Sequence, residues 1–161
     1  MIVVLDASTL INLHNGGVLA QVLSLPGRSF QVSPEVRRES RTVANEIQVA
    51  VERGDIEWVD DTAIAATEFE DALAFWELGP GETECILAAK ALGCVVACDD
   101  GAARRVIAQE IGASRMTGTV GLLRETVVAG YLTATEAFTA YLQMKRLGGF
   151  LPHLALADFQ P

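Results

Sequence analysis

The sequence predicts an α/β fold in which helices cover both faces of a mainly parallel sheet, as a three-layer α/β/α sandwich. Two short runs, residues 2–5 and 94–98, are wholly apolar and rich in Val, which is typical of strands buried on both faces. Longer helical patterns alternate with short strand candidates along the chain. With 161 residues, half of them hydrophobic, the chain can form one domain with its own core.

The first half of the chain supplies three strands and the helices between them. Ser33, Pro34 and Glu35 make a good helix start, with an N-cap, a proline at the first position and an acid in the first turn. The expected elements after the first strand are a helix over 18–25, a strand over 29–32, a helix over 34–53, a strand over 56–59 and a helix over 62–78.

The second half begins with a strong break at residues 79–81, Gly-Pro-Gly, and ends with a helix whose capping box is formed by Thr133 and Glu136. The expected elements are a helix over 82–92, the strand over 94–98, a helix over 101–111, an edge strand over 113–116, a helix over 120–129 with Thr119 as N-cap, and a last helix to 147. We expect residues 1–147 to form the domain. The segment 148–161 is too apolar for a free linker, and we expect it to pack on the domain or on a dimer partner.

The composition limits the classes of function. A net charge of −9 argues against a protein that binds nucleic acid by bulk charge, but not against a nuclease whose carboxylates are offset by metal. No apolar run is long enough for a membrane span and no leader is apparent, so we expect a cytoplasmic protein. The three cysteines are expected to be buried and reduced, and neither histidine has the spacing of a zinc ligand.

Acidic residues follow both buried strands. Asp6 ends the first strand, and Asp99 and Asp100 end the strand over 94–98. The carboxyl ends of parallel strands meet at one edge of a sheet, where α/β proteins bind ligands. The alternative for Asp6 is that it only caps the next helix.

Three further acids lie in predicted helices. Glu82 and Glu84 fall in the first turn of an apolar helix, where acids can simply complement the helix dipole. We favour that interpretation for Glu82 and leave Glu84 open. Glu39 can face the same site or form a surface ion pair with one of the nearby arginines, such as Arg38.

Carboxylates gathered at one edge repel one another, so they need a cation. Oxygen ligands without a nearby histidine favour Mg²⁺ or Mn²⁺. Such a site is suited to in-line phosphoryl chemistry, in which the metal activates water and stabilises the leaving oxygen.

Five stretches in order resemble the motifs of PIN domains: VLDASTLINL, VSPEVRRE, GPGETECILAA, VVACDDGAAR and TGTVGLL. The similarity spans about residues 1–147. The GE-x-E, DD-x-x-AR and GT-x-G motifs are similar to uncharacterised PIN proteins close to the VapC toxins.

The resemblance assigns roles to individual residues. Its acidic, catalytic site falls on Asp6, Glu39, Glu84 and Asp99. The metal ligands it implies are Asp6, Glu84 and Asp99, with Asp100 as an alternative to Asp99. Glu84 is preferred to Glu82 because the residues after it align with the small and apolar helix positions of the family. The supporting polar residues are Ser8 and Thr119. Independently of the resemblance, Arg104 and Arg105 lie one turn beyond the aspartates, where one of them could contact a substrate phosphate or could instead hold Asp100 or Glu110 in place. The negative net charge suggests that RNA affinity depends on local arginines, and the candidates are Arg37, Arg38, Arg41, Arg104 and Arg105.

The resemblance implies a ribonuclease that depends on Mg²⁺ or Mn²⁺ and cleaves RNA. It also implies a homodimer and, for a toxin of a toxin–antitoxin pair, a small antitoxin protein as partner. The alternative is a non-catalytic PIN-like module that binds RNA or protein. Metal affinity separates the two, since a binding module has no need to hold magnesium.

Overall fold

The protein is built around one parallel β-sheet. Its computed structural model describes residues 1–60, 62 and 64–161. The sheet has five strands in the order β3-β2-β1-β4-β5. The strands are β1 (Ile2–Leu5), β2 (Ser29–Val32), β3 (Ile56–Trp58), β4 (Val95–Ala97) and β5 (Met116–Thr117). Every pairing between neighbouring strands is parallel, so the carboxyl ends of the strands lie at one edge.

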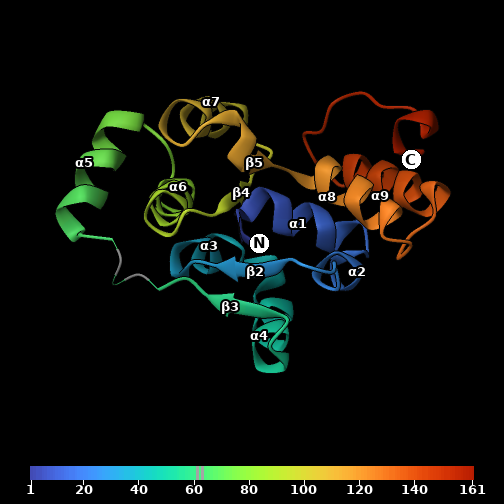
Figure 1. The fold of residues 1–161 in the computed structure, drawn as a ribbon, viewed down its shortest axis with the longest axis horizontal. Coiled ribbons are helices and arrows are strands. Elements are labelled where there is room, and N and C mark those ends of the chain that lie inside the picture. The colour runs from blue at the N-terminus through green and yellow to red at the C-terminus, as the bar shows by residue number, and fades with distance from the viewer. Residues whose placement is uncertain (61, 63) are drawn as a thin grey trace.

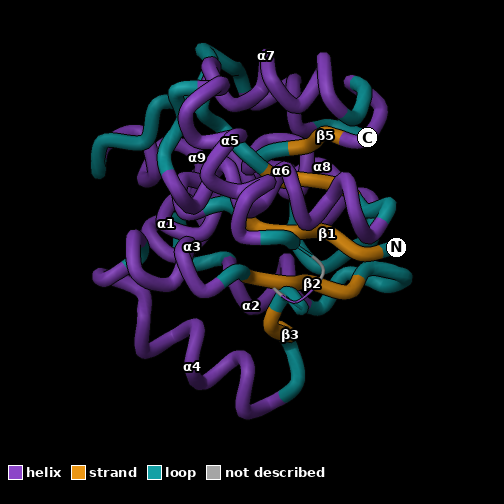
Figure 2. Tube along the Cα trace, turned by 90° about the vertical axis from the view of Figure 1, so that its left-hand side faces the viewer, coloured by secondary structure: helices purple, strands orange, loops and turns teal. Residues whose placement is uncertain are grey.

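Helices cover both faces of this sheet. One group consists of α1 (Ala7–Asn15), α2 (Leu19–Leu23), α8 (Thr119–Val128) and α9 (Ala134–Arg146). The other consists of α3 (Pro34–Glu39), α5 (Ala66–Trp76), α6 (Pro80–Leu92) and α7 (Gly101–Glu110). The sheet passes between the two groups (Figure 1), and its strands follow one another from β3 to β5 in Figure 2. The predicted three-layer α/β/α architecture is confirmed.

The core lies on both faces of the central strands. Val4 and Leu5 of β1 are completely buried, and Val96 of β4 is nearly so. Helix α6 contacts β1 and β4 on one side and α3, α5 and α7 on the others, which explains its apolar sequence. Its Cys85 and Ile86 are fully buried, and the three cysteines are free and buried.

The helix expected over 34–53 is interrupted. Helix α3 ends at Glu39, a 3₁₀ turn follows (η1, Arg41–Val43), and α4 (Ala44–Arg53) continues in another direction. The break falls at Ser40, whose backbone leaves the helical region at φ −89° and ψ 44°. The two helices have different partners, because α3 packs on α6 whereas α4 packs on β3. The chain must therefore turn between them.

Other boundaries also differ from those expected. Helix α5 begins at Ala66 rather than at 62, and residue 63 of the expected helix lies outside the described residues. The expected edge strand over 113–116 is mostly a 3₁₀ turn (η3, Ala113–Arg115) that leads into β5. The N-cap of α8 is Gly118 instead of Thr119, because the Thr119 hydroxyl bonds to Asp99 and not to the helix.

The segment after α9 packs on that helix. Phe159, in a short 3₁₀ turn (η4, Leu156–Phe159), is 1% exposed, and its ring centroid lies 5.6 Å from that of Tyr141. The Tyr141 hydroxyl donates to the Pro152 carbonyl and accepts from the Leu154 N–H at 3.1 Å. None of the described helices combines the length and the apolar character needed to cross a membrane.

Candidate active site

The carboxyl ends of β1 and β4 lie side by side and bring distant aspartates together. Leu5 pairs with Ala97 in the parallel register, and the Asp6 N–H donates to the Ala97 carbonyl at 3.0 Å. Asp6 is therefore beside Cys98, and Asp99 and Asp100 follow Cys98 directly in the chain. Strand β5, the other neighbour of β4, leads to Thr119 at the same edge. This is the edge at which open α/β sheets bind ligands.

Asp6 has one oxygen that is bonded and one that is not. The side chain is nearly buried, at 2% exposed. Its Oδ2 atom accepts from the Ser8 N–H (3.2 Å), the Ser8 hydroxyl (2.6 Å) and the Cys98 thiol (3.5 Å), so Asp6 does cap α1. Its Oδ1 atom is buried too, yet no donor among the described residues reaches it. Burial raises the pKa of Asp6, because the ionised form loses its hydration.

Asp99 is held on all sides by polar groups. Its Oδ1 atom accepts from the Thr119 N–H at 2.9 Å, and its Oδ2 atom accepts from the Asn12 amide at 2.9 Å and from the Thr119 hydroxyl. Its own N–H donates to the Ser8 hydroxyl at 3.2 Å, which in turn bonds to Asp6. Both predicted supporting residues thus contact the site. The contact of Asn12 with Asp99 is not predicted from the sequence. The signal that could have indicated it is a polar residue between the apolar residues Ile11 and Leu13 of α1.

Glu82 belongs to the same electrostatic neighbourhood as Asp6. Its Oε2 atom accepts from the Gly79 N–H at 3.0 Å, at the start of α6. Burial raises the pKa of Glu82, and the negative charges of Asp6, Asp100 and Glu39 raise it further. Acids from three other parts of the chain therefore act on Glu82. The prediction that Glu82 only complements the helix dipole did not include these nearby negative charges. They lie near Glu82 because of how α6 packs against β1.

Glu84 lies deeper and makes a different contact. It is 8% exposed, and its Oε2 atom accepts from the Glu35 N–H at 3.0 Å, which ties α6 to the first turn of α3. Burial raises the pKa of the neighbouring Cys85 thiol, and the charges of Asp6 and Glu84 contribute to the same rise. The assignment of Glu84 as a ligand stays a prediction, and Glu82 joins it as a second candidate.

Glu39 reaches from α3 to the start of α6. Its Oε1 atom accepts from the Gly81 N–H at 2.9 Å. The alternative ion pair with Arg38 does not form, since Arg38 pairs with Glu35 instead. Glu39 is therefore directed toward the helix that carries the other two glutamates.

Asp100 and Arg104 fix α7 at the same edge. The Asp100 Oδ1 atom caps the helix by accepting two backbone N–H groups of its first turn, at 2.7 and 2.8 Å. The Arg104 Nη1 atom donates to the carbonyls of Cys98 (2.7 Å) and Thr117 (2.8 Å), and so ties the ends of β4 and β5 together. Of the two arginines predicted to contact phosphate, Arg104 is engaged by these carbonyls, whereas the Arg105 side chain is exposed to solvent.

Among the described residues, the acids of the site form no ion pair. Within the described part of the chain, the ion pairs are His14–Glu46, Arg28–Glu125, Arg38–Glu35 and Lys90–Glu110. None of them includes an acid of the site. Carboxylates that lack an ion-pair partner favour the binding of a cation.

The residues fit a hard divalent cation in donor chemistry and in charge. The donors are carboxylate oxygens, and the buried Oδ1 atom of Asp6 lacks a partner among the described residues. The side chains are not drawn together as ligands: no three or more His, Cys, Asp or Glu side chains in residues 1–60, 62 and 64–161 form a group that could hold a metal. Glu39, Glu84 and Asp100 each accept backbone N–H bonds instead.

The acidic edge, which is the carboxyl end of the sheet with its group of acids, is open to solvent at Asp99 and Asp100. Asp99 and Asp100 line a cavity of about 350 Å³, together with Ser8, Asn12 and Phe150. The Phe150 side chain is 95% exposed. A ligand of moderate size can therefore approach the aspartates from the side of α1 and the C-terminal segment.

In a comparison with protein families, a family model described as PIN domain matches residues 2–156. Neither a curated protein nor a solved structure matches the chain significantly.

Proposed function

This chain belongs to the PIN-domain family, and from that premise we propose that it is a metal-dependent endoribonuclease that hydrolyses phosphodiester bonds of RNA. PIN domains are generally nucleases and typically depend on divalent metal. The observation that carries the proposal is the buried Oδ1 atom of Asp6, which has no partner among the described residues and belongs to a group of acids that form no ion pair there. The ions we propose are Mg²⁺ and Mn²⁺, which prefer oxygen ligands.

The proposed roles follow from the contacts of each side chain. The carboxylates that would hold the cation come from among Asp6, Glu39, Glu82, Glu84, Asp99 and Asp100. A bound divalent cation supplies water activation and charge stabilisation at the leaving oxygen. Ser8 orients Asp6 and the backbone at Asp99, and Thr119 orients the Asp99 carboxylate, so that the edge is preformed before any ligand arrives.

A role as the toxin of a toxin–antitoxin pair is part of the proposal. Its support is the similarity of the GE-x-E and DD-x-x-AR motifs to proteins close to the VapC toxins. On the same ground we propose a homodimer and a small antitoxin protein as partner. RNA cleavage that this antitoxin inhibits would support the toxin role.

Incubation of the purified protein with labelled single-stranded RNA in Mg²⁺, Mn²⁺ or EDTA tests the enzymatic proposal. We expect cleavage with either ion and none in EDTA. No cleavage with either ion, together with no binding of Mn²⁺, would favour the non-catalytic RNA-binding or interaction module.

Substitution of Gly81 by Ala tests the position of Glu39. A Cβ atom at Gly81 would lie 2.4 Å from the Glu39 Oε2 atom, so Glu39 must move. We expect cleavage to fall roughly 10-fold, because displaced catalytic groups cost rate. Thermal unfolding should change little, because the preference of a helix for Ala over Gly, about 1 kcal/mol, offsets the loss of the bond from the Gly81 N–H to Glu39. Gly101→Ala is the matched control, because the nearest atom to its Cβ is 4.0 Å away. Equal activities of the two variants would contradict the assignment of Glu39.

A further inference from the structure

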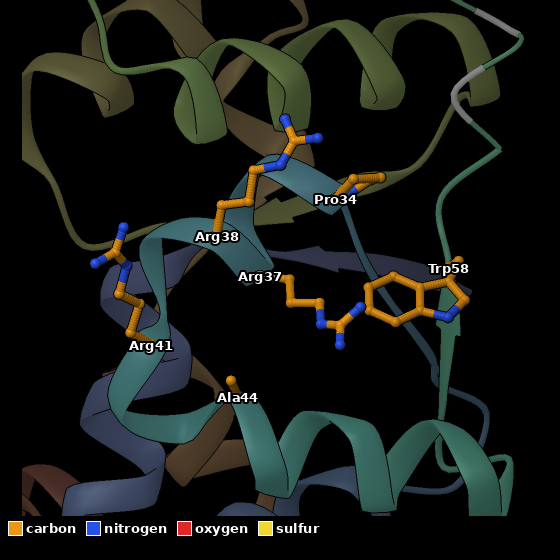
Figure 3. A pocket seen from close by; sticks show the side chains of 6 residues that line it. All are labelled: Pro34, Arg37, Arg38, Arg41, Ala44 and Trp58. Carbon is orange, nitrogen blue, oxygen red and sulfur yellow. The ribbon is translucent and has the colours of Figure 1, made fainter.

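A basic pocket lies between α3, the start of α4 and the end of β3. It has a volume of about 490 Å³ and is lined by Pro34, Arg37, Arg38, Arg41, Ala44 and Trp58. Figure 3 shows the Arg37 side chain extending from α3 toward the Trp58 ring, while Arg38 and Arg41 project from the same stretch of chain. A cavity of this size can hold a small polar ligand.

Positive charge is unusually concentrated here. Three of the twelve basic residues of a chain with net charge −9 fall within five positions. Arg38 is paired with Glu35, whereas Arg37 and Arg41 form no ion pair with the carboxylates that the structure describes. The Arg37 guanidinium carbon lies 5.5 Å from the centroid of the Trp58 ring, a favourable cation–π distance. That contact orients Arg37 while most of its N–H donors stay available.

The pocket opens near the same sheet edge as the acids. Trp58 is the last residue of β3, Asp6 follows β1, and only β2 separates the two strands. Neighbouring strands are about 4.8 Å apart, so the two strand ends are separated by about 10 Å. Helix α3 bridges the distance, because it carries both the arginines and Glu39. A short single strand of nucleic acid can span this length.

We propose that this basic pocket binds one nucleotide of single-stranded RNA beside the site of cleavage. Arg37 and Arg41 contact the phosphate, and Trp58 provides an aromatic surface for the unstacked base. Arginine donors match phosphate oxygens, and aromatic rings bind bases of single strands by stacking. The inference rests on the proposed function for the identity of the ligand, and it deepens that function by locating a substrate subsite.

The test measures RNA binding without cleavage. A fluorescein-labelled, unstructured 12-nucleotide RNA is titrated in Mg²⁺ with protein that carries Asp6→Asn, so that the RNA stays intact. Adding Arg37→Ala and Arg41→Ala should raise Kd about 10-fold and reduce the dependence of log K on log salt by about 0.7, which corresponds to one phosphate of a single strand. Trp58→Ala should raise Kd about 10-fold, and Trp58→Phe should restore most of the affinity. Arg53→Ala, an exposed arginine at the far end of α4, is the matched control and should leave Kd unchanged.

The outcomes separate this inference from the proposed function. If RNA binding does not change when Arg37→Ala and Arg41→Ala are added, or if the Asp6→Asn protein itself does not bind RNA, the assignment of the pocket as an RNA subsite is overturned. A single-stranded DNA of the same sequence that binds more tightly than the RNA would overturn the assignment to RNA. Arginine-dependent binding together with no cleavage by the unsubstituted protein would overturn the nuclease and leave the pocket standing.

Discussion

Substitution of Asp6 by Asn is expected to reduce RNA cleavage at least about 100-fold while the protein remains folded. The change removes the charge of the one site carboxylate that has a buried oxygen without a partner among the described residues. Loss of a group that supports a metal site commonly costs a factor of about 10 to 100, and loss of a ligand costs more. Asparagine has nearly the same volume, and its carbonyl oxygen can still accept from Ser8 and cap α1.

The stability of this variant gives a second check. Burial raises the pKa of Asp6, which means that ionisation at neutral pH costs the metal-free fold stability. Replacement by a neutral amide removes that cost, so we expect thermal unfolding near that of the parent in EDTA. Asp158→Asn is a matched control, since Asp158 caps a 3₁₀ turn in the C-terminal segment through the Ala155 N–H at 2.7 Å. Undiminished cleavage by the folded Asp6 variant would contradict the assigned site.

Glu82→Gln is expected to lower kcat/KM about 100-fold and Glu84→Gln about 10-fold. Glu82 shares its charged neighbourhood with Asp6, Asp100 and Glu39, so its charge belongs to the group that would hold a cation. Glu84 accepts a backbone N–H of α3, and glutamine can keep that bond. The larger effect should therefore follow Glu82.

Initial rates at saturating Mg²⁺ and across a Mg²⁺ titration measure both variants. We expect Glu82→Gln to need more Mg²⁺ for half-maximal rate, because it weakens the proposed cation site. Glu136→Gln, at an exposed capping box of α9, controls for the loss of one carboxylate. If Glu84→Gln had the larger effect, the choice made from the sequence alone would hold and the role of Glu82 would be limited to capping α6.

Much of this architecture could be predicted from local sequence. The apolar runs that end on Asp6 and on Asp99 predict buried parallel strands, and the sheet has them as neighbours. The ordered motifs predict the PIN-domain family, which the match over residues 2–156 confirms. These features depend on patterns within a few residues, so the sequence carries them directly.

Other features depend on contacts between distant elements and were harder to predict. The break at Ser40 arises because α3 and α4 pack on different partners, and no glycine or proline marks it. The neighbourhood of Glu82 depends on the placement of α6 against β1. The bonds of Arg104 to two strand ends, and that of Asn12 to Asp99, likewise join residues that only the folded chain brings together.

Direct measurement of Mn²⁺ binding tests most directly the central claim that the acidic edge holds a divalent cation. Free Mn²⁺ is followed by electron paramagnetic resonance in titrations of the parent and the Asp6→Asn protein, at about pH 7.5 and about pH 5.5. We expect the parent to bind Mn²⁺ and the variant to bind it far more weakly. The affinity of the parent should fall as the pH is lowered, because the raised pKa values of Asp6 and Glu82 let protons compete with the metal. No binding by the parent at the higher pH, or equal binding by the two proteins, would contradict the account.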